Sequence, residues 1–160
     1  MTQDAIAIIG MGCRFPGDIN SPDELWQFLR RGGDAITEVP SDRWNLEAYY
    51  HPDPARRGKT YSRHGGFVRD VLRFDAEFFG MSPREASRAD PQHRLLLEVA
   101  WEALEDGGLT LGQLCEVKVG TFVGISSFDF GGIQSTGRRD LNAYSNVRSL
   151  TAATLHRSLT

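Results

Sequence analysis

The chain carries near its start a short apolar run, Ala5-Ile6-Ala7-Ile8-Ile9, which Gly10 ends. A β-branched run without polar alternation predicts a strand that is buried on both faces, as in α/β sheets. A second apolar run, from Val117 to Val123, ends at Gly124 and predicts another strand. Because helix signals lie between the two runs, the sequence indicates the α/β class.

The first helix signal is the segment Ser21-Pro22-Asp23-Glu24. It combines a capping serine, a proline at the first helical position and a glutamate three residues after the cap. The helix that follows places Leu25, Phe28 and Leu29 on one face, and Gly32-Gly33 ends it.

Two further helices are predicted later in the chain. Ser82-Pro83-Arg84-Glu85 repeats the capping pattern for a short helix, and Asp90-Pro91 begins a longer one that runs to about Asp106, before Gly107-Gly108. Apolar residues cover more than one face of the longer helix, which predicts that it is central and buried. These residues are Leu95, Leu96, Leu97, Val99, Ala100, Trp101, Ala103 and Leu104.

The stretch from Asp34 to Gly66 is rich in Pro, Gly, Tyr, Arg and Asp and shows no clear periodicity. It is too long for a plain connector, so we expect it to pack on the domain surface and to carry interactions. The basic residues that form a locally basic loop near its end indicate either a solvated loop or a contact with an acidic carrier protein or a phosphate. They are Arg56, Arg57, Lys59, Arg63 and His64.

Composition limits the function classes. The chain has 160 residues, 40% hydrophobic and 10% aromatic, enough for the core of one domain or part of one, and a net charge of −3. Charges of both signs are mixed, which disfavours nucleic acid and membrane surfaces as partners. No apolar run approaches the roughly 20 residues of a membrane span, and no secretory signal is visible, so the expected location is the cytoplasm.

Cys13 and Cys115 belong to no C-x-x-C pair, which disfavours a zinc site or a redox dithiol and predicts two reduced, mostly buried thiols. His51, His64 and His156 show no metal-ligand spacing. We therefore expect no metal site.

Two catalytic hypotheses are weak. Gly10-Met11-Gly12 follows a predicted strand, but a dinucleotide-binding turn needs a third glycine where Phe15 stands, and Pro16 stands where a helix should run. Cys13, His93 and Asp90 could supply a nucleophile, a base and an orienting carboxylate, yet Asp90 and His93 fit a helix start better.

Ser126-Ser127 also lacks the context of a hydrolase nucleophile, because Phe128 replaces the closing glycine of that motif. The residues alone predict no catalytic, cofactor-binding or metal-binding site.

Longer strings carry a resemblance. The segment Ile6 to Gly17, IAIIGMGCRFPG, resembles the opening of the ketosynthase domain of modular polyketide synthases. Five later segments follow in family order. They are Glu38 to Trp44 (EVPSDRW) with Gly58 to Tyr61 (GKTY), Gly65 to Phe67 (GGF), Phe74 to Ala86 (FDAEFFGMSPREA) and Asp90 to Glu98 (DPQHRLLLE). Long ordered matches are far more specific than one short motif.

The resemblance implies an α/β thiolase-like fold, of which this chain holds most of the N-terminal half only. Such domains are homodimers that condense a cysteine-bound acyl group with a malonyl-type extender on an acyl carrier protein. The carrier protein brings phosphopantetheine, so no cofactor is expected to bind this chain directly. The family's catalytic cysteine, in a D-T-A-C-S-S-S type motif, and its two histidines match no position here; Cys13, Cys115 and His93 correspond to non-catalytic positions.

The resemblance predicts a ketosynthase segment over residues 5–147 and a divergent tail over residues 148–160, RSLTAATLHRSLT. A shifted reading frame or a truncated gene near Val147 is one hypothesis for the tail, and a genuine family variant is the alternative. An incomplete fold would expose the apolar helix from Pro91 to Asp106, so we expect poor solubility.

Three functions remain in competition at this point. The first is the N-terminal part of a β-ketoacyl synthase that is inactive alone. The second is a non-catalytic module that binds a carrier protein or a second copy, or an inert pseudogene product. The third is an unrelated nucleotide-binding domain, against which the missing third glycine argues.

Overall fold

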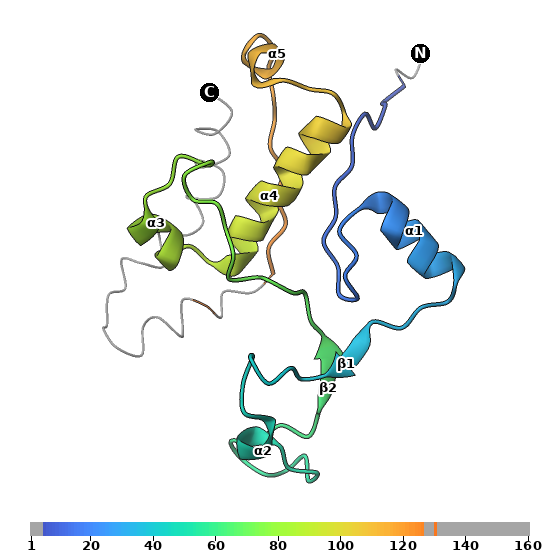
Figure 1. Ribbon diagram of the computed structural model, residues 1–160, viewed down its shortest axis with the longest axis vertical. Coiled ribbons are helices and arrows are strands. Elements are labelled where there is room, and N and C mark those ends of the chain that lie inside the picture. The colour runs from blue at the N-terminus through green and yellow to red at the C-terminus, as the bar shows by residue number, and fades with distance from the viewer. Residues whose placement is uncertain (1–4, 127–129, 131–160) are drawn as a thin grey trace. The chain divides into compact units, whose positions relative to one another are not determined.

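The computed structural model describes residues 5–126 and 130 (Figure 1). The described residues divide into two compact units. One contains residues 12–70, with α1 (Pro22–Arg30), β1 (Ile36–Glu38), α2 (Leu46–Tyr49) and β2 (His64–Gly66). The other contains residues 5–11 and 71 onward, with α3 (Pro83–Arg88), α4 (Pro91–Asp106) and α5 (Leu111–Cys115).

Helix α1 begins where the capping signal predicts. The Ser21 side chain accepts a hydrogen bond from the Glu24 amide at 3.3 Å, and the Glu24 carboxylate accepts one from the Asn20 amide at 2.7 Å. The helix ends before Gly32, whose φ of 64° is the left-handed conformation that glycine adopts without strain. The predicted apolar face is only partly covered, since Leu29 is 60% exposed.

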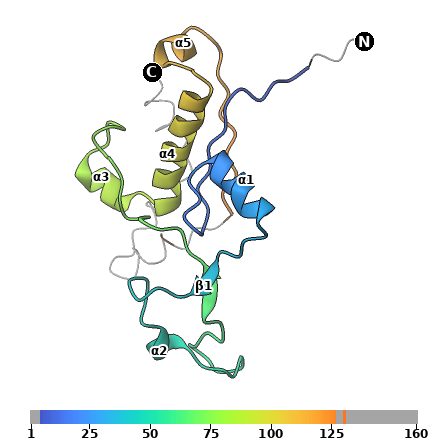
Figure 2. The ribbon, with the colours of Figure 1, turned by 45° about the vertical axis from the view of Figure 1, so that its right-hand side comes forward.

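The stretch from Asp34 to Gly66 is more regular than its sequence predicts. Strands β1 and β2 pair antiparallel, with Ile36 opposite Gly66 and Glu38 opposite His64. Between them, Asn45 caps the short helix α2 by accepting from the Ala48 amide at 3.2 Å. In Figures 1 and 2, α2 lies at the end of the β1–β2 pair that faces away from α1.

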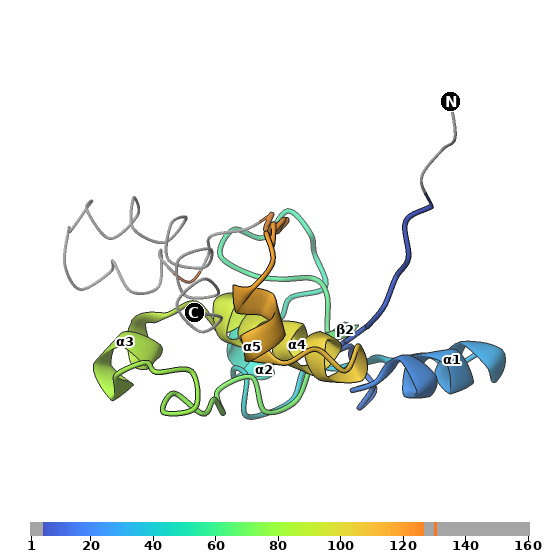
Figure 3. The same cartoon turned by 90° about the horizontal axis from the view of Figure 1, so that it is seen from above.

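Helices α3 and α4 confirm their predicted starts. The side chain of Ser82 accepts from the Glu85 amide at 3.2 Å, and that of Asp90 accepts from the Gln92 amide at 2.9 Å. Helix α5 is not among the predicted helices; a capping box between Thr110 and Gln113 begins it. Figures 1 and 2 show α5 beyond the C-terminal end of α4, so that α5 overlaps α4 when seen from above in Figure 3.

The core of the second unit lies where α4 meets the chain that precedes α3. Phe79, Met81, Ala89 and Leu97 are its buried members. Aromatic rings extend it, because Phe79 stacks on Phe74 with centroids 5.1 Å apart. Phe78 then meets Trp101 edge to face at 4.9 Å. These contacts hold the middle of α4 against the preceding loop.

The two predicted strands are wrong as secondary structure. Neither residues 5–9 nor residues 117–123 form a strand; Figure 2 shows both as extended chain. Ile6 is 97% exposed and Phe122 is 96% exposed. A strand buried on both faces needs neighbouring strands that satisfy its backbone groups, and the described residues supply none for these segments.

Two burial predictions are also wrong. Only His93, Arg94 and Leu97 of α4 are buried, and most of its other residues are half-buried, because the extended segments beside the helix cover it incompletely. Cys13 is half-buried and Cys115 is exposed, so the expectation that both are mostly buried fails; no disulfide joins them.

Candidate functional site

An apolar groove of about 300 Å³ follows α4 in the second unit. One wall is the helix face that carries Leu97 and Trp101, and the opposite wall is the extended segment 119–123. Every lining residue is apolar except Thr121, so the groove contains no general base and no thiol. It is suited to packing against apolar groups rather than to chemistry. The lining residues are Phe79, Leu96, Leu97, Ala100, Trp101, Ala103, Leu104, Val119, Gly120, Thr121, Phe122 and Val123.

Polar residues are buried at the N-terminal end of α4. Asp90, His93 and Arg94 are all less than a tenth exposed, and the Nδ1 atom of His93 and the Nε atom of Arg94 have no hydrogen-bond partner among the described residues. Burial lowers the pKa of His93, and the nearby Asp90 carboxylate opposes this shift. The imidazole is therefore mainly neutral at pH 7.

The structure brings Asp90 and His93 together but gives no support to the triad with Cys13. Cys13 belongs to the other compact unit, and Asp90 is occupied as the cap of α4. The capping interpretation of these two residues is confirmed.

The glycine turn after residue 9 serves packing. A β-carbon on Gly10 would lie 2.1 Å from the Ala103 carbonyl oxygen, so only glycine lets this segment approach α4. The amide of Met11 donates to a carboxylate oxygen of Asp106 at 2.9 Å. Gly10 and Met11 thus contact a helix C-terminus, whereas a phosphate-binding turn presents its amides at a helix N-terminus.

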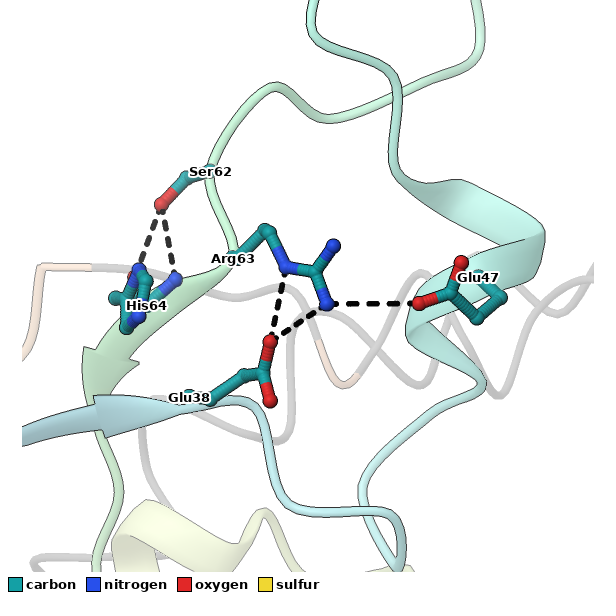
Figure 4. Close-up of polar contacts among 5 residues, drawn as sticks. All are labelled: Glu38, Glu47, Ser62, Arg63 and His64. Atoms are coloured by element: carbon teal, nitrogen blue, oxygen red, sulfur yellow. Dashed lines mark hydrogen bonds and ion pairs between the residues drawn. The ribbon is translucent and has the colours of Figure 1, made fainter.

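Arg63 is the hub of a polar network in the first unit (Figure 4). Its guanidinium group contacts the Glu38 carboxylate at 2.7 Å and that of Glu47 at 3.5 Å, and it lies 4.9 Å from the centre of the Tyr50 ring. Hydrogen bonding to Glu38 raises the pKa of Arg63. Ser62 bonds to the backbone of His64 beside it. Arg63 therefore joins β2 to β1 and α2, and its charge is already paired.

Three other residues of the locally basic loop lie between α2 and β2. Arg56, Arg57 and Lys59 are exposed, and the Lys59 ammonium donates to the Ala48 carbonyl at 2.6 Å. No described residue pairs with either the Arg56 or the Arg57 side chain. Arg63 thus supports the fold through its ion pairs, whereas the side chains of Arg56 and Arg57 have no partner among the described residues.

Metal and membrane sites are not found in the part of the chain that the structure describes. No three His, Cys, Asp or Glu side chains gather as a metal-binding group there. Nor does any described helix have both the length and the apolar character that crossing a bilayer requires. His51 accepts from the Asp53 amide through Nδ1, whereas His156, Ser127 and the tail 148–160 lie outside the described residues.

Residues 3–156 match the family model of the β-ketoacyl synthase N-terminal domain. The chain belongs to the β-ketoacyl synthase family. This ketosynthase segment is 48% identical over 141 residues to a phenolphthiocerol/phthiocerol polyketide synthase of Mycobacterium tuberculosis, in a match that covers 88% of the chain and 8% of that relative. It is 50% identical to polyketide synthase GfsA of Streptomyces halstedii, over 92% of the chain and 2% of that relative.

Solved structures show the fold of the ketosynthase segment. An oxazolomycin ketosynthase domain from Streptomyces albus has a TM-score of 0.65 and 42% identity, over 69% of this chain and 19% of that one. The ketosynthase from module 6 of the bacillaene synthase of Bacillus subtilis has a TM-score of 0.59 and 39% identity, over 69% of this chain and 18% of that one. The predicted α/β thiolase-like fold, present in part, is confirmed.

The chain therefore spans about a fifth of these solved ketosynthase chains and a tenth or less of these polyketide synthases. Sequence reasoning found the family but missed both local sites. The groove had a signal in the apolar residues that cover more than one face of the helix from Pro91 to Asp106. The pairing of Arg63 with Glu38 had none, because 25 residues separate them.

Proposed function

We propose that this chain is the N-terminal part of a ketosynthase whose complete domain extends a polyketide by one unit. In that reaction an acyl group is held as a cysteine thioester. Loss of carbon dioxide from a malonyl-type thioester on a carrier protein then gives an enolate, which attacks the acyl carbonyl and releases the cysteine thiolate. The carrier protein supplies the phosphopantetheine, so the chain needs no cofactor of its own.

The observation that carries this proposal is the match of residues 3–156 to one family model, together with polyketide synthase relatives at 48% and 50% identity. The described residues support a structural role for this segment within that domain. Their groove is apolar, His93 is buried beside a helix cap, and Cys13 lies in a different compact unit from His93. We infer that the chain alone carries none of the catalytic residues.

Acyl loading tests both inferences. The chain is incubated with an acyl N-acetylcysteamine thioester, and the intact mass is measured; we expect no acyl adduct. A longer polypeptide of the same synthase that contains the D-T-A-C-S-S-S type motif serves as the matched control and should gain one acyl group. An adduct on Cys13 or Cys115 would overturn the inference that this chain is inactive, and an inert longer polypeptide would overturn the proposed reaction.

A second candidate is a non-catalytic module that binds a carrier protein or a second copy of the chain. The unpaired arginines at positions 56 and 57 favour it, because they offer positive charge to an acidic partner. Carrier binding without acyl transfer supports this candidate, and absence of binding counts against it. The division at Val147 into a ketosynthase segment and a divergent tail stays a prediction.

A further inference from the structure

Residues 51–59 form a closed surface loop between α2 and β2. Tyr50 and Thr60 form a parallel bridge at its neck. The amide of His51 donates to the Thr60 carbonyl and that of Thr60 donates to the Tyr49 carbonyl, both at 2.8 Å. The two ends of the loop are therefore fixed to each other by backbone hydrogen bonds.

The interior of the loop is ordered by its own polar groups. The amide of Asp53 donates to the His51 ring, and its carboxylate accepts from the Ala55 amide at 2.9 Å. The Arg56 amide donates to the Asp53 carbonyl, which closes a turn. Lys59 binds the Ala48 carbonyl near the end of α2. The carboxylate of Asp53 and the ammonium of Lys59 thus both support the loop.

Arg56 and Arg57 differ from these buttressing residues. Both are exposed, and neither side chain has a hydrogen bond, an ion pair or a ring contact with a described residue. A guanidinium group presents five donors in a planar fork that matches a carboxylate. Because the loop backbone is already fixed, a partner would have to order only the two side chains, and the conformational entropy cost within this chain is small.

The surroundings favour a protein partner over a nucleic acid. Tyr49 and Tyr61 flank the loop neck and are 54% and 67% exposed. Arginine and tyrosine are both enriched at the centres of protein–protein interfaces relative to the rest of the protein surface. Of the basic side chains in the loop, Arg56 and Arg57 alone are unpaired among the described residues, whereas binding of a phosphate backbone draws on roughly six to ten cationic contacts.

We propose that loop 51–59 is a docking surface for an acidic protein domain, whose carboxylates pair with Arg56 and Arg57. That this domain is the acyl carrier protein rests on the proposed function. The position of the surface rests only on the loop.

The test measures binding of the full 160-residue chain to a fluorescein-labelled acyl carrier protein by fluorescence anisotropy. The charge-reversal variant R56E/R57E should bind about tenfold or more weakly, and raising the salt from about 50 mM to 300 mM should weaken the wild type in the same direction. The matched control is R30E/R31E, an equal charge change at the exposed end of α1 in the same unit, which should bind within about twofold of the wild type.

Further variants distinguish a loss of charge contact from a loss of folding. R56Q/R57Q removes the charge without reversing it and should give an intermediate loss, and far-UV circular dichroism checks that each variant keeps its helices. A carrier protein with surface Asp and Glu changed to Lys should bind R56E/R57E better than it binds the wild type, as a direct charge contact requires.

Three results would each overturn the docking surface. The first is equal affinity of R56E/R57E and R30E/R31E for the carrier protein, and the second is no measurable binding by the wild type. The third is tighter binding of a DNA oligonucleotide than of the carrier protein. Condensation by the longer polypeptide is measured in parallel. If the longer polypeptide does not condense but R56E/R57E weakens carrier binding, the proposed function alone is contradicted. If the longer polypeptide condenses but R56E/R57E binds the carrier protein as the wild type does, the docking surface alone is contradicted.

Discussion

The backbone amide of Met11 donates a hydrogen bond of 2.9 Å to the carboxylate of Asp106, across 95 positions of sequence. One residue earlier, Gly10 touches the same end of α4 through its backbone. Together these contacts attach the extended N-terminal segment of the second unit to the helix, although that segment forms no ladder with a described strand.

Two variants of Asp106 distinguish the contribution of its hydrogen bond to the free energy of unfolding from the contribution of its negative charge. The carboxylate lies at the negative end of the α4 dipole, so D106N relieves an unfavourable interaction worth roughly 0.3–1 kcal/mol and keeps an acceptor. D106A removes the acceptor as well and should be less stable than D106N by about 1 kcal/mol. Urea unfolding followed by circular dichroism measures the difference. For the exposed neighbour Glu105, the Ala and Gln variants should agree within about 0.5 kcal/mol.

Gly10 should tolerate no side chain. G10A places a methyl group 2.1 Å from the Ala103 carbonyl oxygen, which the backbone must move to accommodate. We expect a loss of about 2–3 kcal/mol in the free energy of unfolding, measured by urea denaturation. Gly112 in α5 is the control, because a methyl group there would have no atom within 4 Å and G112A should be stabilising by up to about 1 kcal/mol. Similar stabilities for G10A and G112A would contradict the close approach.

Stability should depend on pH through His93. Burial lowers the pKa of His93 in the folded chain below its ordinary value of 6.5, so the unfolded chain binds the proton more readily. This contribution is fully present above pH 6.5 and is lost as the pH falls from there toward the folded-state pKa. Denaturant unfolding at about pH 7.5 and about pH 5.5 measures it. H93Q should show a smaller decrease than the wild type, while H64Q, at an exposed site, should show the wild-type decrease.

The exposed apolar residues predict self-association. Ile6 and Phe122 are almost fully exposed on extended segments, and such side chains promote aggregation. We expect the wild-type chain to elute from a sizing column as oligomers or to precipitate, and I6K/F122K to raise the soluble monomeric fraction. The unfolding measurements above are therefore made in the I6K/F122K background. I6L/F122L keeps the apolar surface and should behave as the wild type. A soluble wild-type monomer that unfolds cooperatively would show that the poor-solubility prediction is wrong.

The helices were predictable because their signals are local. Ser21, Ser82 and Asp90 each bind amides two or three residues ahead, so the cap and the helix start are written in adjacent positions. The short capping box of α5 was equally local but was missed. The family, too, was evident in ordered strings that need no tertiary information.

Strand pairing and burial were not predictable from the same sequence. Residues 5–9 have the composition of a buried strand, but a strand exists only when another segment satisfies its backbone groups. The apolar faces of α4 indicate what the helix can bury, and only the arrangement of other elements decides whether it does. The sequence by itself determined where α1, α3 and α4 begin, and it determined the family. The tertiary structure alone decided which charges are paired, as at Arg63, and which are left exposed, as at Arg56 and Arg57, because those contacts join positions far apart in the chain or depend on a closed loop.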